Sequence, residues 1–144
     1  MTALIELTDD ADWLVSMRAI DLLEKLAHNH PDWVEPYKKV FIGALADSDK
    51  WEIRLQIVRA LPLFKWKPAE LRRVYEILVR DIEHPQKFVR AWALDSLATL
   101  SVTRSDFAPL VHRCLREFEG SDSKALQARA RHIRKRLAIG GVSR

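Results

Sequence analysis

Residues 87–100 read KFVRAWALDSLATL, and residues 51–64 read WEIRLQIVRALPLF. Aligned without a gap, both stretches have an aliphatic residue at the third position, an isoleucine or alanine at the seventh, and a large apolar residue at the last. Positions 3, 7, 11 and 14 lie on one side of a helix with 3.6 residues per turn. Each stretch therefore predicts an amphipathic α-helix, because a strand would need alternating apolar and polar residues.

The same pattern occurs near both ends of the chain. Residues 13–26 (WLVSMRAIDLLEKL) and 124–137 (KALQARARHIRKRL) align with the first two stretches, and successive copies are offset by 38, 36 and 37 residues. Three further segments with the helical spacing of apolar residues lie between these four copies, at 33–45, 69–82 and 106–119. A period of this length indicates a repeat protein built from helix hairpins of about 37 residues.

Proline and turn residues separate the predicted helices. Pro36, Pro68 and Pro109 lie at or near the first turns of the three intervening segments, where a missing N–H does no harm. Pro62 lies late in its copy and is expected to bend or end that helix near Leu61. The joints ADSDKW, IEHPQKF and EGSDSK contain the Asp, Ser, Gly and Pro that form turns and N-caps.

Two of the copies share a finer motif, in which a turn is followed by Val/Ile-Arg-x-x-Ala and then by Leu-x-x-Leu, with an Asp-x-Asp turn in one of them. Its residues are Asp47, Asp49, Ile53, Arg54, Leu61 and Phe64 in one copy, and Val89, Arg90, Ala93, Leu97 and Leu100 in the other. Over about residues 11–138 the chain resembles the HEAT-repeat family. The outer copies depart from the motif, because Ser16 and Gln127 replace its arginine.

The resemblance implies an all-α fold, a right-handed α-α superhelix of the HEAT-like or armadillo type. This short solenoid would have about seven helices in roughly three and a half repeats. We expect a single domain over 1–144. Its parts would be a leading helix at 11–28, hairpins at about 32–65, 68–101 and 105–138, and a flexible tail at 139–144. In the resembled family the motif arginine commonly pairs with a turn aspartate of an adjacent repeat, which implies such a pair for Arg54 or Arg90.

Composition favours a folded, water-soluble chain. Of the 144 residues, 48% are hydrophobic and 31% are charged. No run of 18 apolar residues predicts a membrane span, and the start MTALIELTDD lacks the features of a secretory signal. The single cysteine, Cys114, cannot form an internal disulfide and lies in an apolar pattern, so we expect it to be buried. A cytoplasmic location is the default expectation.

The net charge of +4 conceals a gradient along the chain. Residues 1–35 carry eight acidic and two basic residues, a net charge of −6. Residues 104–144 carry ten basic and four acidic residues, a net charge of +6. A polyanion would therefore meet the protein at its C-terminal end.

A candidate binding groove follows from the resemblance, because the second helices of HEAT-like hairpins usually line the concave surface. Trp92 is interpreted either as part of this groove or as a wedge packed between repeats. Asp21, Arg59, Asp95 and His132 share the ninth position of the copies, and their alternating sign suggests ion pairs across neighbouring helices. The candidate groove residues are Arg18, Arg59, Trp92, Asp95, Arg129, His132 and Arg136.

The last copy also carries a basic C-terminal patch, formed by Arg131, Arg134 and Lys135. Two interpretations are open. A terminal repeat has no neighbour on one side, so its outer face must be polar. Alternatively, the helix binds phosphates, and each contact would release counterions.

Catalysis finds little support in the residues. His28, His30 and Asp32 are close in sequence but lie in a predicted loop without further ligands, so no metal site is expected. No P-loop or nucleophile elbow occurs. DNA glycosylases of HEAT-like architecture use an aspartate and tryptophans on a basic concave face, and Trp92 with Asp95 is similar to such a pair. This chain is shorter than those enzymes, which puts that role in doubt.

Three functional hypotheses result. The first is a non-enzymatic scaffold or adaptor that binds another protein through its concave surface. The second is binding to a DNA or RNA backbone through the basic C-terminal helix, with a DNA-alkylation-repair-like role as a lesser variant. The third is weak self-association of the acidic start with the basic end, in a chain that is otherwise monomeric. No catalytic residue, metal ligand, cofactor or membrane partner is predicted.

Overall fold

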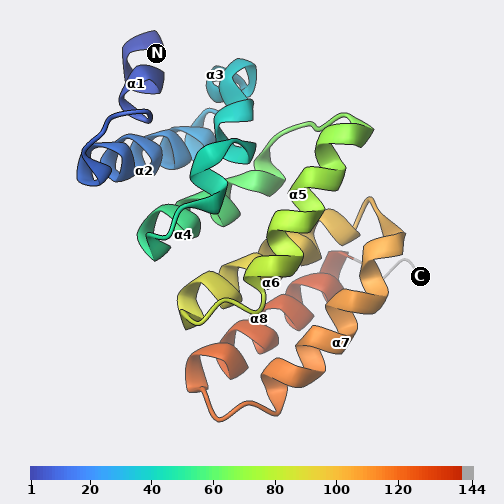
Figure 1. Ribbon diagram of the computed structural model, residues 1–144. Coiled ribbons are helices and arrows are strands. Elements are labelled where there is room, and N and C mark those ends of the chain that lie inside the picture. The colour runs from blue at the N-terminus through green and yellow to red at the C-terminus, as the bar shows by residue number, and fades with distance from the viewer. Residues whose placement is uncertain (141–144) are drawn as a thin grey trace. The chain divides into compact units, whose positions relative to one another are not determined.

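The computed structural model describes residues 1–140 and is built of α-helices and short 3-10 helices (Figure 1). Helices account for 81% of the chain, and no strand occurs within the described residues. The prediction of an all-α protein is therefore confirmed. The chain divides into two compact units, residues Met1–Ile77 and the residues from Leu78 onward. The predicted solenoid and its single domain stay predictions.

The first unit is organised around the packing of α2 against α4. These two helices bury Ile20 and Leu23 of α2 and Ile53 and Ile57 of α4. The elements of this unit are α1 (Thr2–Leu7), α2 (Trp13–Asn29), α3 (Pro31–Val34), 3-10 helices Glu35–Ile42 and Ala44–Asp47, α4 (Trp51–Ala60), and a 3-10 turn Leu61–Leu63. Helix α5 (Pro68–Asp81) begins in this unit and ends in the next.

The second unit packs α8 against both α6 and α7 (Figure 1). Its core includes Leu94 and Leu97 of α6, Leu115 and Phe118 of α7, and Ile133 of α8. Its elements after α5 are α6 (Lys87–Ser101), a 3-10 turn Ser105–Phe107, α7 (Ala108–Glu119) and α8 (Lys124–Gly140). Cys114 is buried in α7, as expected from its position in the apolar pattern.

The four aligned copies all form helices, and each helix begins at the first residue of its copy. These first residues are Trp13 in α2, Trp51 in α4, Lys87 in α6 and Lys124 in α8. Helix α4 ends at Ala60 and continues as the 3-10 turn that contains Pro62, which confirms the predicted effect of this proline.

Two segments differ from the sequence-based expectation. Residues 33–45 do not form one α-helix, because Pro36 and Gly43 divide the segment and most of it is 3-10 helix. The tail predicted from 139 begins too early, since α8 runs through Ala138 and Ile139 to Gly140 without a helix-breaking residue before its end. Residues 141–144 of that predicted tail lie outside the described residues.

Each copy is preceded by the same hydrogen-bonded turn. Three residues before the helix starts, a polar side chain accepts a hydrogen bond from the backbone N–H two residues further on. The acceptors are Asp10, Ser48, His84 and Ser121, and they lie 2.8, 3.1, 2.9 and 3.0 Å from the nitrogens of Asp12, Lys50, Gln86 and Ser123. This bond fixes the chain direction just ahead of each helix.

The fourth residue of each copy closes this turn from inside the helix. Its side chain donates to a backbone carbonyl of the turn, and in three copies that carbonyl belongs to the residue whose side chain is the acceptor. The bonds are Ser16 to Asp10 (2.9 Å), Arg54 to Ser48 (3.2 Å), Gln127 to Ser121, and Arg90 to Ile82 (2.8 Å). Serine and glutamine in the outer copies therefore take the place of the motif arginine.

The arginine of the third copy differs from one of the two alternatives implied by the family resemblance. Arg90 donates its Nε–H to the Ile82 carbonyl, and its guanidinium lies 5.4 Å from the ring centre of Phe118. Among residues 1–140 it has no aspartate partner. A carbonyl of the preceding turn is closer than any carboxylate, so the pair implied by the family resemblance does not form at Arg90.

Replacing Ser121 by alanine tests the repeated turn. The substitution leaves the Ser123 N–H without its side-chain acceptor, and we expect a loss of about 0.5–1.5 kcal/mol in the free energy of unfolding. Urea denaturation followed by circular dichroism at 222 nm measures the change. The matched control is Ser105→Ala, at an exposed serine whose side chain makes no hydrogen bond within residues 1–140. Equal losses in both variants would contradict a special role of the turn.

Candidate functional site

Four of the seven candidate groove residues meet in the second unit, between α6 and α8. We call Trp92, Asp95, Arg129 and Arg136 the Asp95 cluster. The Asp95 carboxylate accepts from Arg129 at 3.0 Å and from Arg136 at 3.1 Å. The guanidinium carbon of Arg129 also lies 4.3 Å from the ring centre of Trp92. The cluster thus joins two helices through one carboxylate, two cations and one aromatic ring.

This arrangement makes the cluster an internal tie. Asp95 is only 6% exposed, and Arg136 donates further to the Asp95 carbonyl and to the Thr99 hydroxyl, each at 3.2 Å. The groove hypothesis left Arg129 and Arg136 free to bind an external ligand. In the structure both guanidinium groups bind Asp95. The Asp95 carboxylate is thus shared by two guanidinium groups of the same protein.

The remaining groove residues are not part of this cluster. Arg18 and Arg59 belong to the first unit, where Arg18 is exposed on α2 and Arg59 lies 3.5 Å from the carboxylate of Glu24. His132 is exposed on α8 and, within the described residues, has no ion-pair partner. The predicted pairing of Asp95 with the ninth residue of the next copy is therefore wrong at His132. Arg129 and Arg136 approach from one helical turn before and after it.

Sequence reasoning missed Glu24 as a buried charge. Its side chain is 1% exposed, and its oxygens lie 2.5 Å from His28 Nε2, 3.5 Å from Arg59 Nε and 3.8 Å from Lys25 Nζ. The i, i+4 spacing of Glu24 and His28 on one helix was the available signal. The sequence alone does not single out Glu24, because charged residues are rarely fully buried.

The histidines near the end of α2 have separate partners. His28 contacts Glu24, whereas His30 stacks on the indole of Trp33 with ring centres 3.8 Å apart. Within residues 1–140, no group of three or more His, Cys, Asp and Glu side chains is arranged to hold a metal ion.

The basic residues of α8 fall into two groups according to their partners. Arg129 and Arg136 bind Asp95, and Arg134 binds Glu119 of α7, with its Nη2 3.0 Å from Oε1. The three other cations of the helix, Lys124, Arg131 and Lys135, are exposed. None of these three has an acidic partner within the part of the chain that the structure describes.

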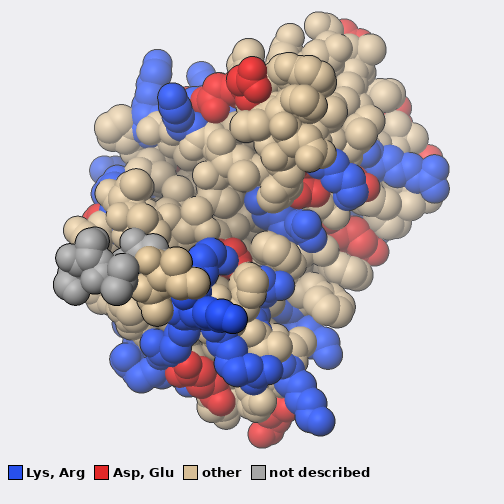
Figure 2. Space-filling view, turned by 180° about the vertical axis from the view of Figure 1, so that it is seen from behind, with Lys and Arg blue, Asp and Glu red and all other residues tan. Residues whose placement is uncertain are grey.

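The three unpaired cations lie on one line of the helix. We call Lys124, Arg131 and Lys135 the α8 stripe. Their spacing of seven and four residues places them within about 40° of one another around the helix axis, opposite the buried Leu126 and Ile133. Figure 2 shows Lys and Arg side chains gathered in the lower half of the molecule, where they outnumber Asp and Glu.

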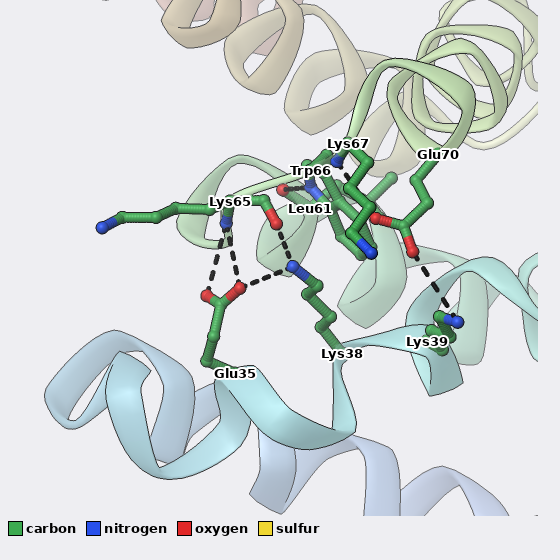
Figure 3. Close-up of polar contacts among 8 residues, drawn as sticks. All are labelled: Glu35, Lys38, Lys39, Leu61, Lys65, Trp66, Lys67 and Glu70. Carbon is green, nitrogen blue, oxygen red and sulfur yellow. Dashed lines mark hydrogen bonds and ion pairs between the residues drawn. The ribbon is translucent and has the colours of Figure 1, made fainter.

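A second group of lysines surrounds Trp66 in the first unit (Figure 3). The Glu35 carboxylate accepts from the Lys65 N–H at 3.3 Å and pairs with Lys38 at 2.7 Å. The Lys38 ammonium also donates to the Lys65 carbonyl and lies 5.2 Å from the Trp66 ring centre. These bonds fold the connection between α4 and α5 onto the preceding 3-10 helix.

The other side of the same connection is held by Glu70. Its carboxylate accepts from the Lys67 N–H at 3.0 Å and lies 3.9 Å from the Lys39 ammonium (Figure 3). The Trp66 indole N–H donates to the Leu61 carbonyl at 2.8 Å. Both carboxylates and the indole are therefore used to hold the connection in place. These contacts are structural.

No helix in the described part of the chain is long and apolar enough to cross a membrane. Comparison with protein-family models, with curated proteins and with solved structures finds no match to this chain. The resemblance to HEAT repeats therefore rests on the sequence motif and the helical pattern alone.

Replacing Asp95 by asparagine tests whether the Asp95 cluster is a structural tie. Asparagine keeps the shape but leaves two guanidinium groups without their counter-charge, and we expect a loss of about 1–3 kcal/mol in the free energy of unfolding. Chemical denaturation measures it. The matched control, Asp122→Asn, changes an exposed aspartate that has no partner among the described residues, and should stay within about 0.5 kcal/mol. Similar losses in both would refute the tie.

The Arg134–Glu119 pair predicts a pH response. The hydrogen bond between the Glu119 carboxylate and Arg134 is the main cause that lowers the pKa of Glu119 below its ordinary value. The pair therefore contributes at neutral pH, and its contribution is lost as the pH falls through the lowered pKa. We expect Arg134→Gln to raise the pKa of Glu119 toward the ordinary value, measured by ¹³C NMR titration of its carboxyl carbon. Arg131→Gln is the control and should leave the titration unchanged; an equal rise there would contradict the pairing.

Proposed function

We propose that this chain is a non-enzymatic, HEAT-like repeat module that binds the phosphate backbone of a nucleic acid through the open face of α8. The observation that supports this proposal is the α8 stripe, Lys124, Arg131 and Lys135, whose cations are exposed and without acidic partners within residues 1–140. In the proposed fold, the hairpins stack as a right-handed α-α superhelix. The turn that recurs before all four copies supports this repeat architecture.

The spacing of the stripe favours an extended anion over a small one. At 1.5 Å per residue, Lys124 and Arg131 are separated by about 10 Å along the helix, and Arg131 and Lys135 by about 6 Å. A single phosphate or carboxylate cannot contact all three cations. A nucleic-acid strand carries one charge for about every 3.4 Å of duplex axis, so it can meet each of them.

The paired and unpaired cations of α8 lie on different sides of the helix. A terminal helix whose outer face only had to be soluble would not need this separation. A polar outer face could use residues of either sign, as many exposed helices do. On α8 the cations near the protein core are neutralised by Asp95 and Glu119, and only cations remain on the stripe. The paired arginines hold the helix in place, and the unpaired residues supply the attraction.

Removing the three stripe charges should weaken binding to duplex DNA. For the variant Lys124→Gln, Arg131→Gln, Lys135→Gln, we expect the slope of log affinity against log salt to fall by about 3, since each phosphate contact contributes about 0.9. The affinity at low salt should fall by more than tenfold, measured by fluorescence anisotropy with a labelled duplex at several salt concentrations. The melting temperature should not fall, because these side chains are exposed.

The matched control removes the same charge from the first unit, at the exposed residues Lys65, Lys67 and Arg72, each changed to Gln. This control should bind DNA nearly as well as the parent chain. Equal weakening in both triple variants would assign the attraction to net charge rather than to α8. Binding that is indifferent to salt would contradict contact with phosphates.

A protein-binding scaffold is the second candidate, favoured by the exposed face of α2. Leu14 and Leu22 are 44% and 49% exposed and flank Arg18 at a spacing of four residues, which forms a mixed apolar and cationic strip. Exposed apolar side chains in a row are typical of protein contact surfaces. Capture of one defined protein after nuclease treatment, lost in a Leu14→Ser, Leu22→Ser variant, would support this candidate.

The single cysteine suits a reducing location, and we propose the cytoplasm.

A further inference from the structure

A cavity of about 260 Å³ opens to solvent in the second unit, between the end of α5, the start of α6 and α7. One part of its lining is apolar and consists of Val79, Ile82, Leu110 and Cys114. Its volume is slightly below the range of about 300–1,000 Å³ that holds drug-sized ligands, so it suits a smaller molecule.

The thiol in this cavity belongs to the apolar lining. Cys114 is 4% exposed, and burial is the largest cause that raises the pKa of its thiol, followed by the charge of Glu117. A thiol in such surroundings stays protonated at neutral pH and behaves as a small hydrophobic group. The cavity therefore lacks a reactive nucleophile at this position and offers a surface for aliphatic groups.

Two cations and two anions complete the lining. They are Arg90 and Arg113, and Glu83 and Glu117. Within the described residues, the side chains of Glu83 and Arg113 take part in no ion pair or hydrogen bond. The Glu117 carboxylate is in no ion pair there, and it accepts a hydrogen bond from the Cys114 thiol. Four charges of balanced sign thus surround one space without neutralising one another directly.

Arg90 is the best oriented of these groups. Its Nε–H donates to the Ile82 carbonyl at 2.8 Å, and its guanidinium carbon lies 5.4 Å from the centre of the Phe118 ring. These contacts leave its two terminal amino groups without a partner among residues 1–140. A guanidinium held in this way is preorganised to bind a carboxylate through two parallel hydrogen bonds.

We propose that this cavity binds a small zwitterion with an aliphatic body, the chemistry of an apolar α-amino acid such as leucine. Arg90 and Arg113 receive the carboxylate, Glu83 and Glu117 receive the ammonium group, and the apolar lining receives the side chain. A ligand of one sign would leave half of these charges uncompensated, whereas a zwitterion matches both. The site is separate from the α8 stripe, so either proposal can fail while the other holds.

Binding is tested with L-leucine and with two molecules that each lack one of its charges, 4-methylpentanoate and 3-methylbutylamine. The readout is the change in backbone amide NMR shifts of the full chain at increasing ligand concentration. We expect leucine to bind saturably at one site, with the largest shifts at Leu110, Arg113 and Cys114. Each one-charge analogue should bind about tenfold more weakly, because it forfeits one set of charged hydrogen bonds.

Variants then assign the charged contacts. Arg113 and Glu117 are exposed, so Arg113→Gln and Glu117→Gln should fold normally and weaken leucine binding about tenfold. The matched control, Arg116→Gln, removes an exposed arginine of the same helix that does not line the cavity, and should bind leucine unchanged.

The proposal is overturned by any of three results. These results are the lack of a saturable shift with leucine, binding of leucine no tighter than that of both one-charge analogues, and an Arg116→Gln variant that weakens binding as much as Arg113→Gln does. None of these results bears on DNA binding by α8, which is measured separately.

Discussion

A hydrogen bond from the fourth residue of each helical copy to a carbonyl of the preceding turn is the contact on which this structure depends. The first turn of an α-helix leaves backbone groups without partners, and the chain before it can leave in many directions. Here a turn side chain satisfies one N–H, and the helix side chain at the fourth position binds a turn carbonyl. Together these two bonds fix where the helix starts and how the chain enters it. Because the turn recurs four times, the four helices begin at equivalent residues.

The residue type at this fourth position can vary as long as it donates. Serine, arginine and glutamine all reach a turn carbonyl, since the distance between helix and turn is short and each carries an O–H or N–H at its end. Arginine carries five N–H donors, more than the turn requires. At Arg90, one N–H holds the turn, and the remaining amino groups face a cavity lined by Glu83 and Glu117. The same side chain therefore both holds the turn and lines the cavity.

The cations of α8 divide into paired and unpaired residues because, within the described residues, only Asp95 and Glu119 lie close enough to bind them. A buried carboxylate must be matched by cations, and Asp95 takes two of them from α8. Glu119 takes a third. Lys124, Arg131 and Lys135 have no acidic partner among residues 1–140, and their side chains are exposed. Helix α8 therefore presents paired arginines to the protein, and its unpaired cations Lys124, Arg131 and Lys135 are exposed.

Local features of the sequence determined the all-helical class, the four helix starts and the effect of Pro62. These are local properties, because the apolar stripe, the turn residues and the proline all act within a few residues of sequence. The same local signal was too weak for 33–45, where Pro36 and Gly43 turn an apparent helix into 3-10 segments. It was also too weak for α1, which has six residues and buries none of them.

Only the tertiary structure decided which charges meet. Arg129, His132 and Arg136 share one flank of α8, so sequence could not say that the two arginines reach Asp95 and that the histidine does not. Which residue reaches Asp95 depends on side-chain length and on the offset between the axes of α6 and α8. A periodic sequence pattern specifies neither. The same holds for Glu24, whose burial follows from the approach of α4, and for the cavity around Arg90, which three elements distant in sequence form together.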